Sequence, residues 1–453
     1  MVFPSLRSLP AGHRTVIRRL GSGVPALVML AAPALAGTPQ QTGQLASPLT
    51  RPSIPPLQPQ RQPPVPLASL PAPPQPVALP RLQSQVSCPA LQQRLIASLG
   101  GATSAWSVSV ADAQGRLLAD VNGLQPRVPA SNQKLVSTAF ALDRLGPDYR
   151  LSTRLWRLPD GGFRLTGEGD PDLALPQLQR FAQLAMASGL SSTAVRFELA
   201  EEPRQQWWPS GWNPADRVYA YGAPITRLAI TSNAVEDAVM NPPSRLQVLL
   251  QRAVGQAGGA AQLTVVSSRS PLPGGAQVLH EERSAPMHNL LSLANSDSHN
   301  FTAEVLMRQA AGSWDLTEAQ RLTSQWLFSQ ELPLQGVRIA DGSGLDRSNR
   351  LTSRFLAALL MRMDQHPYGR NYLASMAVAG QRGTLRNLFN GSSLQGRFYG
   401  KTGTLTGVRS ISGVLATADG PRYVSAISNG AANPNTVIGQ VLRTVQNTQL
   451  CSL

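Results

Sequence analysis

Lys134 could act as a base for Ser131, because its residue type and position fit that chemistry. The chain has 40 Lys and Arg side chains, and only two of them are lysines. Ser131 lies three positions before Lys134 at the expected start of a helix, where residues three apart share one face. A serine nucleophile needs a base, and lysine can serve when burial lowers its pKa. Arginine cannot, because its pKa stays above about 12. A solvated helix pair is the alternative.

The second lysine begins the run Lys401-Thr402-Gly403-Thr404. It precedes "GVRSISGVL", which we expect to be an edge strand, and glycine at 403 would let a ligand backbone approach that strand closely. Thr402 and Thr404 offer hydroxyl groups, and Lys401 offers a compact positive charge. A lysine placed before a tight turn is the alternative interpretation.

Ser298 and Asn300 form an S-x-N sequence between the two lysines. Their hydroxyl and amide could shuttle a proton and hold a substrate carbonyl. The rival register, Ser296-Asp297-Ser298, lacks the asparagine, so we reject it. Nothing in the sequence gives His299 a role, and we expect its side chain to face solvent. We expect Glu304 to form a helix salt bridge, and Asp170 and Asp341 to be turn or capping residues.

The order S-x-x-K, S-x-N, K-T-G is more specific than any of its parts, and it marks penicillin-binding proteins and class A β-lactamases. The motifs are 167 and 103 positions apart. The chain resembles the class C low-molecular-mass penicillin-binding proteins, of the penicillin-binding protein 4 type. The resemblance covers roughly residues 88–450 and includes "LTGEGDPDL", "YGAP", "NSDSHNFTAEVLMR", "DGSGLDRSNRLT" and "AVAGQRGTLRNLF".

The resemblance implies a serine D-alanyl-D-alanine carboxypeptidase or endopeptidase that acts on peptidoglycan stem peptides and binds β-lactam antibiotics covalently. Ser131 would attack, Lys134 would take its proton, and Ser298 with Lys401 would pass a proton to the leaving group. The substrate would be bound by Asn300, Lys401, Thr402, Gly403 and Thr404. Backbone N–H groups of Ser131 and Thr404 would form the oxyanion hole. No cofactor or metal is implied.

Two departures from the family pattern matter. The middle residue of S-x-N is histidine, where the family often has Asp or Asn. The gap before Ser298 is also shorter than in members with two extra domains, which suggests that one of these is reduced or absent. A serine β-lactamase and a catalytically idle peptidoglycan-binding scaffold remain alternatives, although no deacylating glutamate can be identified and all motif side chains are present.

The elements expected around the motifs indicate an α/β fold of the serine β-lactamase and penicillin-binding-protein type, an antiparallel sheet flanked by helices. "PALQQRLIASL" has helical spacing, "AWSVSVADAQGRLLADVN" predicts a hairpin, and the chain ends in a second hairpin and a helix over about Asn435–Val445. We assign residues 87–150 and 285–453 to this discontinuous peptidase domain. Residues 151–284, rich in Pro, Gly and Trp, are expected to form an inserted, mainly β subdomain.

The first 86 residues differ in composition from the rest. A basic start, a short apolar run and "ALA" at 34–36 predict a secretion signal over residues 1–36, with a retained membrane anchor as the alternative. Residues 38–86 contain 14 prolines, so we expect residues 37–86 to be an extended linker. The peptidase would then be periplasmic or secreted, and only an uncleaved signal would contact the membrane.

The cysteines, the histidines and the charge bear on whether the chain has a disulfide, a metal site or a nucleic-acid partner. Cys88 and Cys451 flank the expected folded region and would form a disulfide in an oxidising compartment, or else remain two free thiols. Their spacing, and the absence of H-E-x-x-H among five histidines, argue against a metal site. The net charge of +15 comes from scattered arginines without a nucleic-acid-binding motif, so no nucleic-acid partner is expected.

Overall fold

The first sheet carries the C-terminal motif and is antiparallel throughout. The structure, a computed structural model, describes residues 80–188, 194–449 and 451. Side chains on β11 alternate between the two faces, since Tyr423 and Ile427 pack in one hydrophobic core and Val424 and Ala426 in another. The strands, in spatial order, are β2 (Leu117–Val121), β1 (Trp106–Asp112), β11 (Gly420–Asn429), β10 (Val408–Thr417), β9 (Phe398–Leu405) and β8 (Ala377–Val378).

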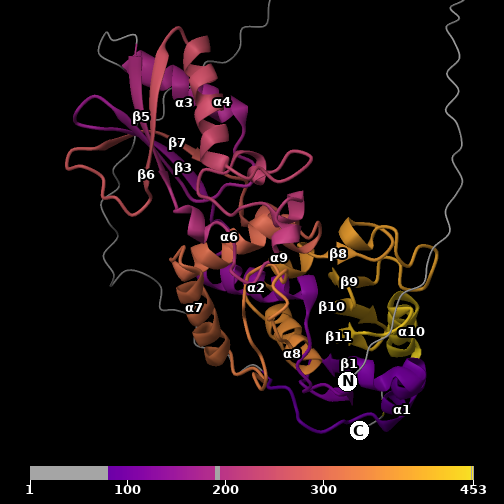
Figure 1. Ribbon diagram of the computed structural model, residues 1–453. Coiled ribbons are helices and arrows are strands. Elements are labelled where there is room, and N and C mark those ends of the chain that lie inside the picture. Colours follow the sequence, from indigo (N-terminus) through magenta and orange to yellow (C-terminus); the bar gives the residue numbers. More distant parts are fainter. Residues whose placement is uncertain (1–79, 189–193, 450, 452–453) are drawn as a thin grey trace, which may run out of the picture. The chain divides into compact units, whose positions relative to one another are not determined.

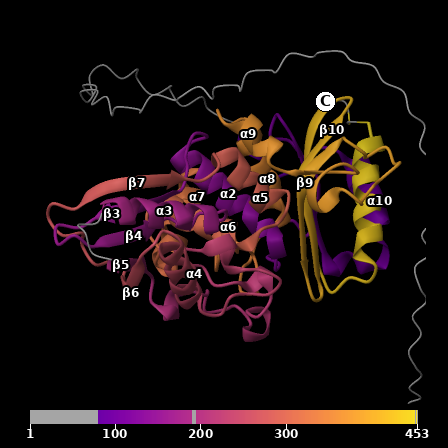
Figure 2. The same cartoon turned by 90° about the horizontal axis from the view of Figure 1, so that it is seen from above.

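Helices cover both faces of this sheet (Figures 1 and 2). The two terminal helices, α1 (Pro89–Leu99) and α10 (Pro434–Asn447), pack together on one face, and each begins with a proline that suits a first helical turn. The opposite face packs against a helical layer that contributes the other two motifs. This layer contains α2 (Lys134–Leu145), α5 (Met287–Asn295), α6 (Asn300–Ala311), α7 (Leu316–Ser329), α8 (Ser353–Asp364) and α9 (Gly369–Ala374).

The expected fold class is confirmed, with one difference in the sheet. The helix over "PALQQRLIASL", both hairpins and the final helix are present. However, the run expected to be an edge strand is β10, which lies inside the sheet between β9 and β11. The K-T-G sequence belongs to β9, and β8 pairs only with Tyr399 and Gly400 of that strand. Residues 401–405 therefore lie along an open edge of the sheet.

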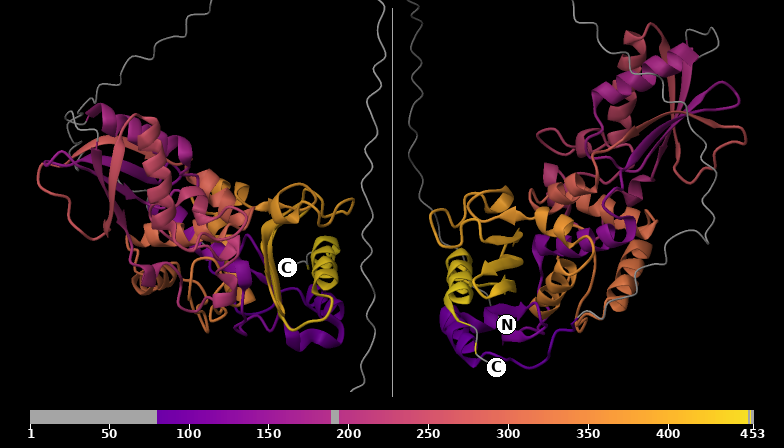
Figure 3. Two further views of the ribbon diagram at one scale, coloured as in Figure 1. Left: turned by 45° about the horizontal axis from the view of Figure 1, so that its top comes forward. Right: turned by 180° about the vertical axis from the view of Figure 1, so that it is seen from behind.

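Residues 152–283 build a second sheet with mixed strand directions (Figure 3). Its strands, in spatial order, are β6 (Ala260–Ser267), β5 (Ala194–Glu201), β4 (Phe163–Gly167), β3 (Ser152–Arg157) and β7 (Gln277–Arg283). The parallel pairs β4–β5 and β5–β6 are connected through helices α3 (Leu175–Ser188) and α4 (Pro242–Gln256). These helices and the sheet share one hydrophobic core.

The expectation of a mainly β insertion is therefore corrected, because two long helices lie on this sheet. Parallel neighbouring strands require a crossover connection, and helices supply it here. In α3 the buried residues Leu178, Phe181, Ala182 and Ala185 recur at helical spacing. This periodicity is present in the sequence. The expectation was instead based on the Pro, Gly and Trp content of the whole segment, which comes mainly from its loops.

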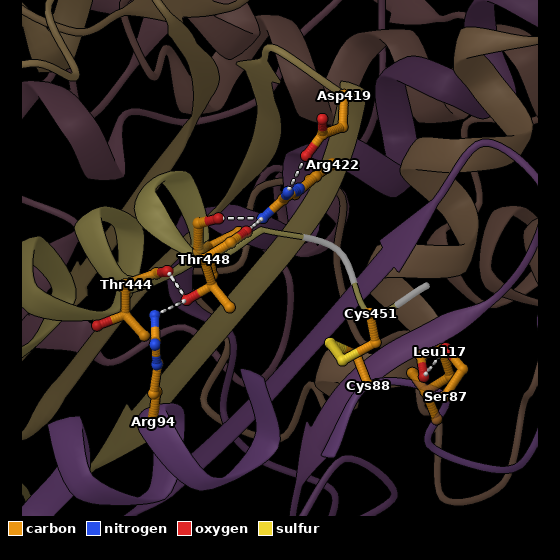
Figure 4. Close-up of a disulfide and its surroundings, with 10 residues drawn as sticks. Ser87, Cys88, Arg94, Leu117, Asp419, Arg422, Thr444, Thr448 and Cys451 are labelled. Carbon is orange, nitrogen blue, oxygen red and sulfur yellow. Dashed lines mark hydrogen bonds and ion pairs between the residues drawn. A yellow bond between two sulfur atoms is a disulfide. The ribbon is translucent and has the colours of Figure 1, made fainter. Parts of the chain in front are cut away.

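A disulfide joins the two ends of the peptidase fold. Cys88 precedes α1, Cys451 follows α10, and their Cα atoms are 5.3 Å apart. Figure 4 shows this bond beside Arg94, whose guanidinium lies 3.5 Å from the Thr448 hydroxyl, and Arg422, which donates to the Thr448 carbonyl at 2.9 Å. The predicted pairing of the two cysteines is thus confirmed.

Most of the expected N-terminal segments lie outside the described residues. This applies to the predicted secretion signal and to the linker up to residue 79. The last residues of the expected linker already pack on the fold, since the backbone N–H of Gln83 donates to the carbonyl of Gly115 at 2.8 Å. In the described part of the chain, no helix is long and apolar enough to span a bilayer.

Candidate active site

Ser131 and Lys134 lie where a short 3-10 turn runs into α2. The turn spans Ala130–Gln133, and Lys134 is the first residue of the α-helix. The Lys134 Nζ donates to the Ser131 Oγ at 3.0 Å, to the Asn300 Oδ1 at 2.6 Å and to the Ser343 carbonyl at 2.7 Å. The amine is therefore held beside the serine hydroxyl, as the S-x-x-K spacing predicts.

The S-x-N residues lie in the loop that connects α5 to α6. Ser298 has φ of +64°, in the left-handed region, and Asn300 is the first residue of α6. The loop is fixed by backbone hydrogen bonds, among them one from His299 N–H to the Leu293 carbonyl at 2.9 Å. The Asn300 Nδ2 donates to the Tyr221 carbonyl at 2.7 Å, so this residue connects the first motif to the insertion.

Lys401 comes from β9 and reaches the S-x-N loop from the other side. Its Nζ donates to the Ser298 Oγ at 2.9 Å and to the Thr402 carbonyl at 2.8 Å. The Thr402 hydroxyl donates to the Thr384 hydroxyl at 2.8 Å, and Arg409 donates to the Thr404 hydroxyl. The three motifs, far apart in the chain, thus converge on Ser131 and Ser298.

Gly403 was expected to let a ligand backbone approach the strand, but the structure gives a different reason for glycine at this position. A side chain there would not block a ligand, because this face of β9 is covered by the chain's own backbone. A Cβ atom at Gly403 would lie 2.2 Å from the Ser410 hydroxyl, 2.7 Å from the Pro129 carbonyl and 3.1 Å from the Ser131 nitrogen. The glycine therefore lets the nucleophile turn pack directly against the K-T-G strand.

Burial lowers the pKa of both lysines. Lys134 is fully buried, and burial lowers its pKa to about 7, although the carboxylates of Asp341 and Glu304 act in the opposite direction. Burial also brings the pKa of Lys401 well below its usual value, and the charge of Lys134 lowers it further. An amine with a pKa near 7 is present in both forms at neutral pH, so Lys134 can accept and return a proton.

The His299 side chain was expected to face solvent, but the structure shows otherwise. It is half-buried, and its Nδ1 lies 2.7 Å from the Thr302 hydroxyl. Burial and the nearby Lys134 charge lower the pKa of His299 to about 4. The imidazole is therefore neutral at physiological pH.

The loop of residues 341–344, which contains none of the three motifs, supports Lys134. Both oxygens of the buried Glu304 carboxylate are occupied, since Oε1 accepts from the N–H groups of Gly342 and Ser343 at 2.9 and 2.8 Å, and Oε2 pairs with Arg308 at 2.7 Å. Asp341 caps the same loop by accepting from Gly344 N–H at 2.7 Å. The salt bridge of Glu304 and the capping role of Asp341 are confirmed. The contact from the Ser343 carbonyl to Lys134 was missed, because a backbone acceptor leaves no signal in residue type.

The motifs line a cleft of about 950 Å³. Ser131, Ser298, Asn300 and Thr404 lie along its walls, and Tyr221 from the insertion completes one side. Farther along, the cleft is lined by both acidic and basic groups, which are Asp216, Asp346 and Arg347. It can therefore hold an extended peptide with charged groups of either sign beside a serine and two buried amines.

Comparison with known proteins agrees with this geometry. The model of the D-Ala-D-Ala carboxypeptidase 3 (S13) family matches residues 90–243 and 235–447. The chain belongs to this family. It is a serine-type D-alanyl-D-alanine carboxypeptidase of the class C penicillin-binding type.

Individual relatives in this family cover most of the chain. A carboxypeptidase of Mycobacterium tuberculosis is 30% identical over an alignment of 383 residues that covers 75% of this chain and 81% of that protein. A D-alanyl-D-alanine carboxypeptidase of Actinomadura is 27% identical over 434 residues, covering 74% of this chain and 79% of that one. In structure, penicillin-binding protein 4 of Haemophilus influenzae superposes with a TM-score of 0.68 at 19% identity, over 78% of this chain and 98% of that chain. This likeness shows a shared fold.

Proposed function

We propose that this S13 enzyme acts on peptidoglycan stem peptides, with Ser131 as the nucleophile and Lys134 as its base. One observation carries the assignment. The Lys134 Nζ lies 3.0 Å from the Ser131 Oγ, and burial lowers the pKa of that amine to about 7. A base poised near the working pH transfers protons most effectively.

The reaction we propose has two halves. The Ser131 Oγ attacks the carbonyl of the penultimate D-alanine while its proton moves to Lys134. The backbone N–H groups of Ser131 and Thr404 hold the oxyanion. The C–N bond then breaks, and the leaving amine takes a proton through Ser298, which accepts a hydrogen bond from Lys401 at 2.9 Å. Water attacks the resulting ester, which releases the peptide carboxylate and restores the serine.

The remaining motif residues would bind the substrate. Asn300 would hold the substrate amide, while Thr402 and Thr404, backed by Lys401, would hold a terminal carboxylate at the open edge of β9. Gly403 would keep that strand against the nucleophile turn. A β-lactam would acylate Ser131 in the same way. Its hydrolysed product would be released slowly, because this acyl-enzyme resists hydrolysis.

For the whole chain we propose export and a two-part peptidase region. Residues 1–36 would direct secretion, and residues 37–86 would form an extended linker between this segment and the enzyme. The enzyme would act in the periplasm or outside the cell. Residues 87–150 and 285–453 would form the D,D-peptidase domain. Residues 151–284 would form an insertion that supplies part of the cleft wall through Tyr221.

Mass spectrometry of purified peptidoglycan fragments tests this proposal. Incubation with the enzyme should remove terminal D-alanine from monomeric stem peptides or split cross-linked dimers, and a fluorescent penicillin should attach to Ser131. Ser131→Ala should abolish all of these reactions, and Ser324→Ala, at an exposed serine of α7 outside the motifs, should not. If the fragments stay unchanged, or if Ser131→Ala matches the wild type, the proposal is wrong.

A further inference from the structure

A second cavity lies beside the catalytic cleft. This chamber has a volume of about 570 Å³, and its walls include Asp172, Ser232 and Val235 from the insertion and Asp297 and His299 from the S-x-N loop. The chamber and the cleft share Tyr221, Ser298 and Asn300 as lining residues. The hydrogen bond from Asn300 to the Tyr221 carbonyl therefore separates two adjoining spaces.

The polar groups of the chamber are mainly hydrogen-bond acceptors, and the charge of one of them, Asp297, acts on the Lys401 amine nearby. Asp172 and Asp297 are exposed, and neither makes an ion pair within the described residues. No lysine or arginine is among the described lining residues. The His299 imidazole is neutral, and its Nδ1 is already engaged by Thr302. The chamber thus offers acceptors to a ligand rich in hydroxyl and amide N–H groups, and it disfavours an anion.

Exposed aromatic and apolar side chains gather in the segment that supplies Tyr221 and Val235 to the chamber wall. The described part of the chain exposes twelve large hydrophobic residues. Five of them fall within residues 218–240, and they are Val218, Tyr219, Tyr221, Val235 and Met240. The rings of Tyr219 and Tyr221 are stacked, with centroids 5.4 Å apart and planes 15° apart, and both side chains are about half exposed. Concentrated exposed apolar surface marks a binding site more often than scattered residues do.

One wall of the chamber has an unusual backbone conformation. Thr231, Ser232 and Asn233 all have φ between +51° and +56°. Such a conformation is strained for non-glycine residues and persists only when the surroundings hold it. Here the Ser232 hydroxyl donates to the Pro171 carbonyl at 2.8 Å, and the Asn233 amide donates to Pro224 and Thr226. Hydrogen bonds within the protein therefore hold this wall in place.

From these features we propose that the chamber and the Tyr219–Tyr221 stack bind the N-acetylated sugar chain to which stem peptides are attached. An aromatic ring face suits the apolar face of a pyranose, while carboxylate and hydroxyl acceptors suit sugar hydroxyls and the acetamido N–H. The chamber adjoins the cleft, so a stem peptide extended along the cleft can carry its sugar toward the chamber. The proposal rests on the stem-peptide activity proposed above.

Two matched substrates test the proposal. One is a free stem pentapeptide, and the other is the same peptide carrying its N-acetylated disaccharide. For the wild type we expect kcat/KM to be about tenfold higher for the glycopeptide, which corresponds to about 1.4 kcal/mol. Tyr219→Ser should reduce this ratio to about 1–2, while Tyr219→Trp should preserve it by keeping an aromatic face. Asp172→Asn should lower it about threefold, by removing an acceptor for the sugar hydroxyls.

The control is Glu236→Gln, which changes an exposed carboxylate on the same loop that does not line the chamber. It should leave the ratio unchanged. All variants should hydrolyse the free peptide and react with fluorescent penicillin at the wild-type rate, which shows that the catalytic site is intact. Equal kcat/KM for the two substrates in the wild type, or an unchanged ratio in Tyr219→Ser, would overturn the sugar site and leave the proposed function standing. If the wild type does not hydrolyse the free peptide at all, the proposed function itself is wrong.

Discussion

Lys134 and Lys401 are both fully buried, and this explains why arginine does not replace them. A guanidinium keeps its proton at any physiological pH, so it would place a permanent charge in a dry site. Lysine can adapt by losing its proton. From the sequence, the ability to lose a proton explained lysine only at position 134, and Lys401 was expected to supply a compact charge. Because both side chains are buried, the same explanation applies to Lys401.

Replacing Lys134 by arginine tests whether proton loss is essential. We expect Lys134→Arg to slow acylation by a fluorescent penicillin by about 10³-fold or more, within the range general-base catalysis contributes. Stopped-flow fluorescence would measure the rate, and circular dichroism would check that the variant is folded. A loss of less than about tenfold would show that another group is the base.

The pH dependence of acylation offers a second test at this scale. Because the Lys134 pKa is about 7, the rate should rise about tenfold per pH unit below pH 7 and level off above it, as the amine loses its proton. A histidine could produce a similar limb, but the His299 pKa is about 4. His299→Asn should therefore leave the midpoint unchanged. A midpoint that moves or disappears in this variant would assign the limb to the imidazole instead.

At the scale of elements, helix α6 connects the S-x-N loop to the loop below Lys134. Its first residue is Asn300, and one turn later the buried Glu304 holds the backbone of Gly342 and Ser343. The ion pair from Glu304 to Arg308 is fully buried. Removing one partner of such a pair leaves an uncompensated charge, which is far more costly than losing an exposed pair.

Two matched variants should separate the buried pair from an exposed one. Glu304→Gln should lower the free energy of unfolding by about 3–5 kcal/mol, because Arg308 remains buried without its counter-charge. Glu318→Gln, which breaks the solvent-exposed pair with Arg321, should leave the free energy of unfolding nearly unchanged. Denaturant unfolding followed by circular dichroism measures both. Similar losses in the two variants would contradict the buried role of Glu304.

Sequence patterns predicted the elements that carry local periodicity and missed those that depend on packing. The helix after Pro129 and both hairpins follow directly from their residues. The position of β10 inside the sheet could not be predicted, because strand order depends on contacts between distant segments. Gly403 was identified, but the reason for it required the position of Pro129 against β9.

At the scale of the whole chain, the motif order predicted the fold because three short sequences must meet at one serine. The insertion was less predictable, since its helices α3 and α4 carry no motif. Its contribution to the cleft could not be predicted either. It depends on the hydrogen bond from Asn300 to the Tyr221 carbonyl, and a backbone acceptor is independent of residue type.

The disulfide is the feature whose effect extends over the whole peptidase fold. It joins residues 363 positions apart and closes nearly all of the described chain into one loop. Cross-linking so long a loop restricts the unfolded chain strongly, so the Cys88→Ser, Cys451→Ser double variant should lose about 3–5 kcal/mol of stability. Its acylation rate at 25 °C should stay near the wild-type value, because the disulfide lies with α1 and α10 on the sheet face opposite the helices of the cleft.

The comparison that decides this is denaturant unfolding of the wild type and the double variant, with and without a reducing agent. The reducing agent should lower the wild-type midpoint to that of the double variant and leave the variant unchanged. If the oxidised wild type and the variant unfold at the same midpoint, the bond does not stabilise the fold. If acylation slows along with stability, the two ends of the chain must influence the cleft through the sheet between them.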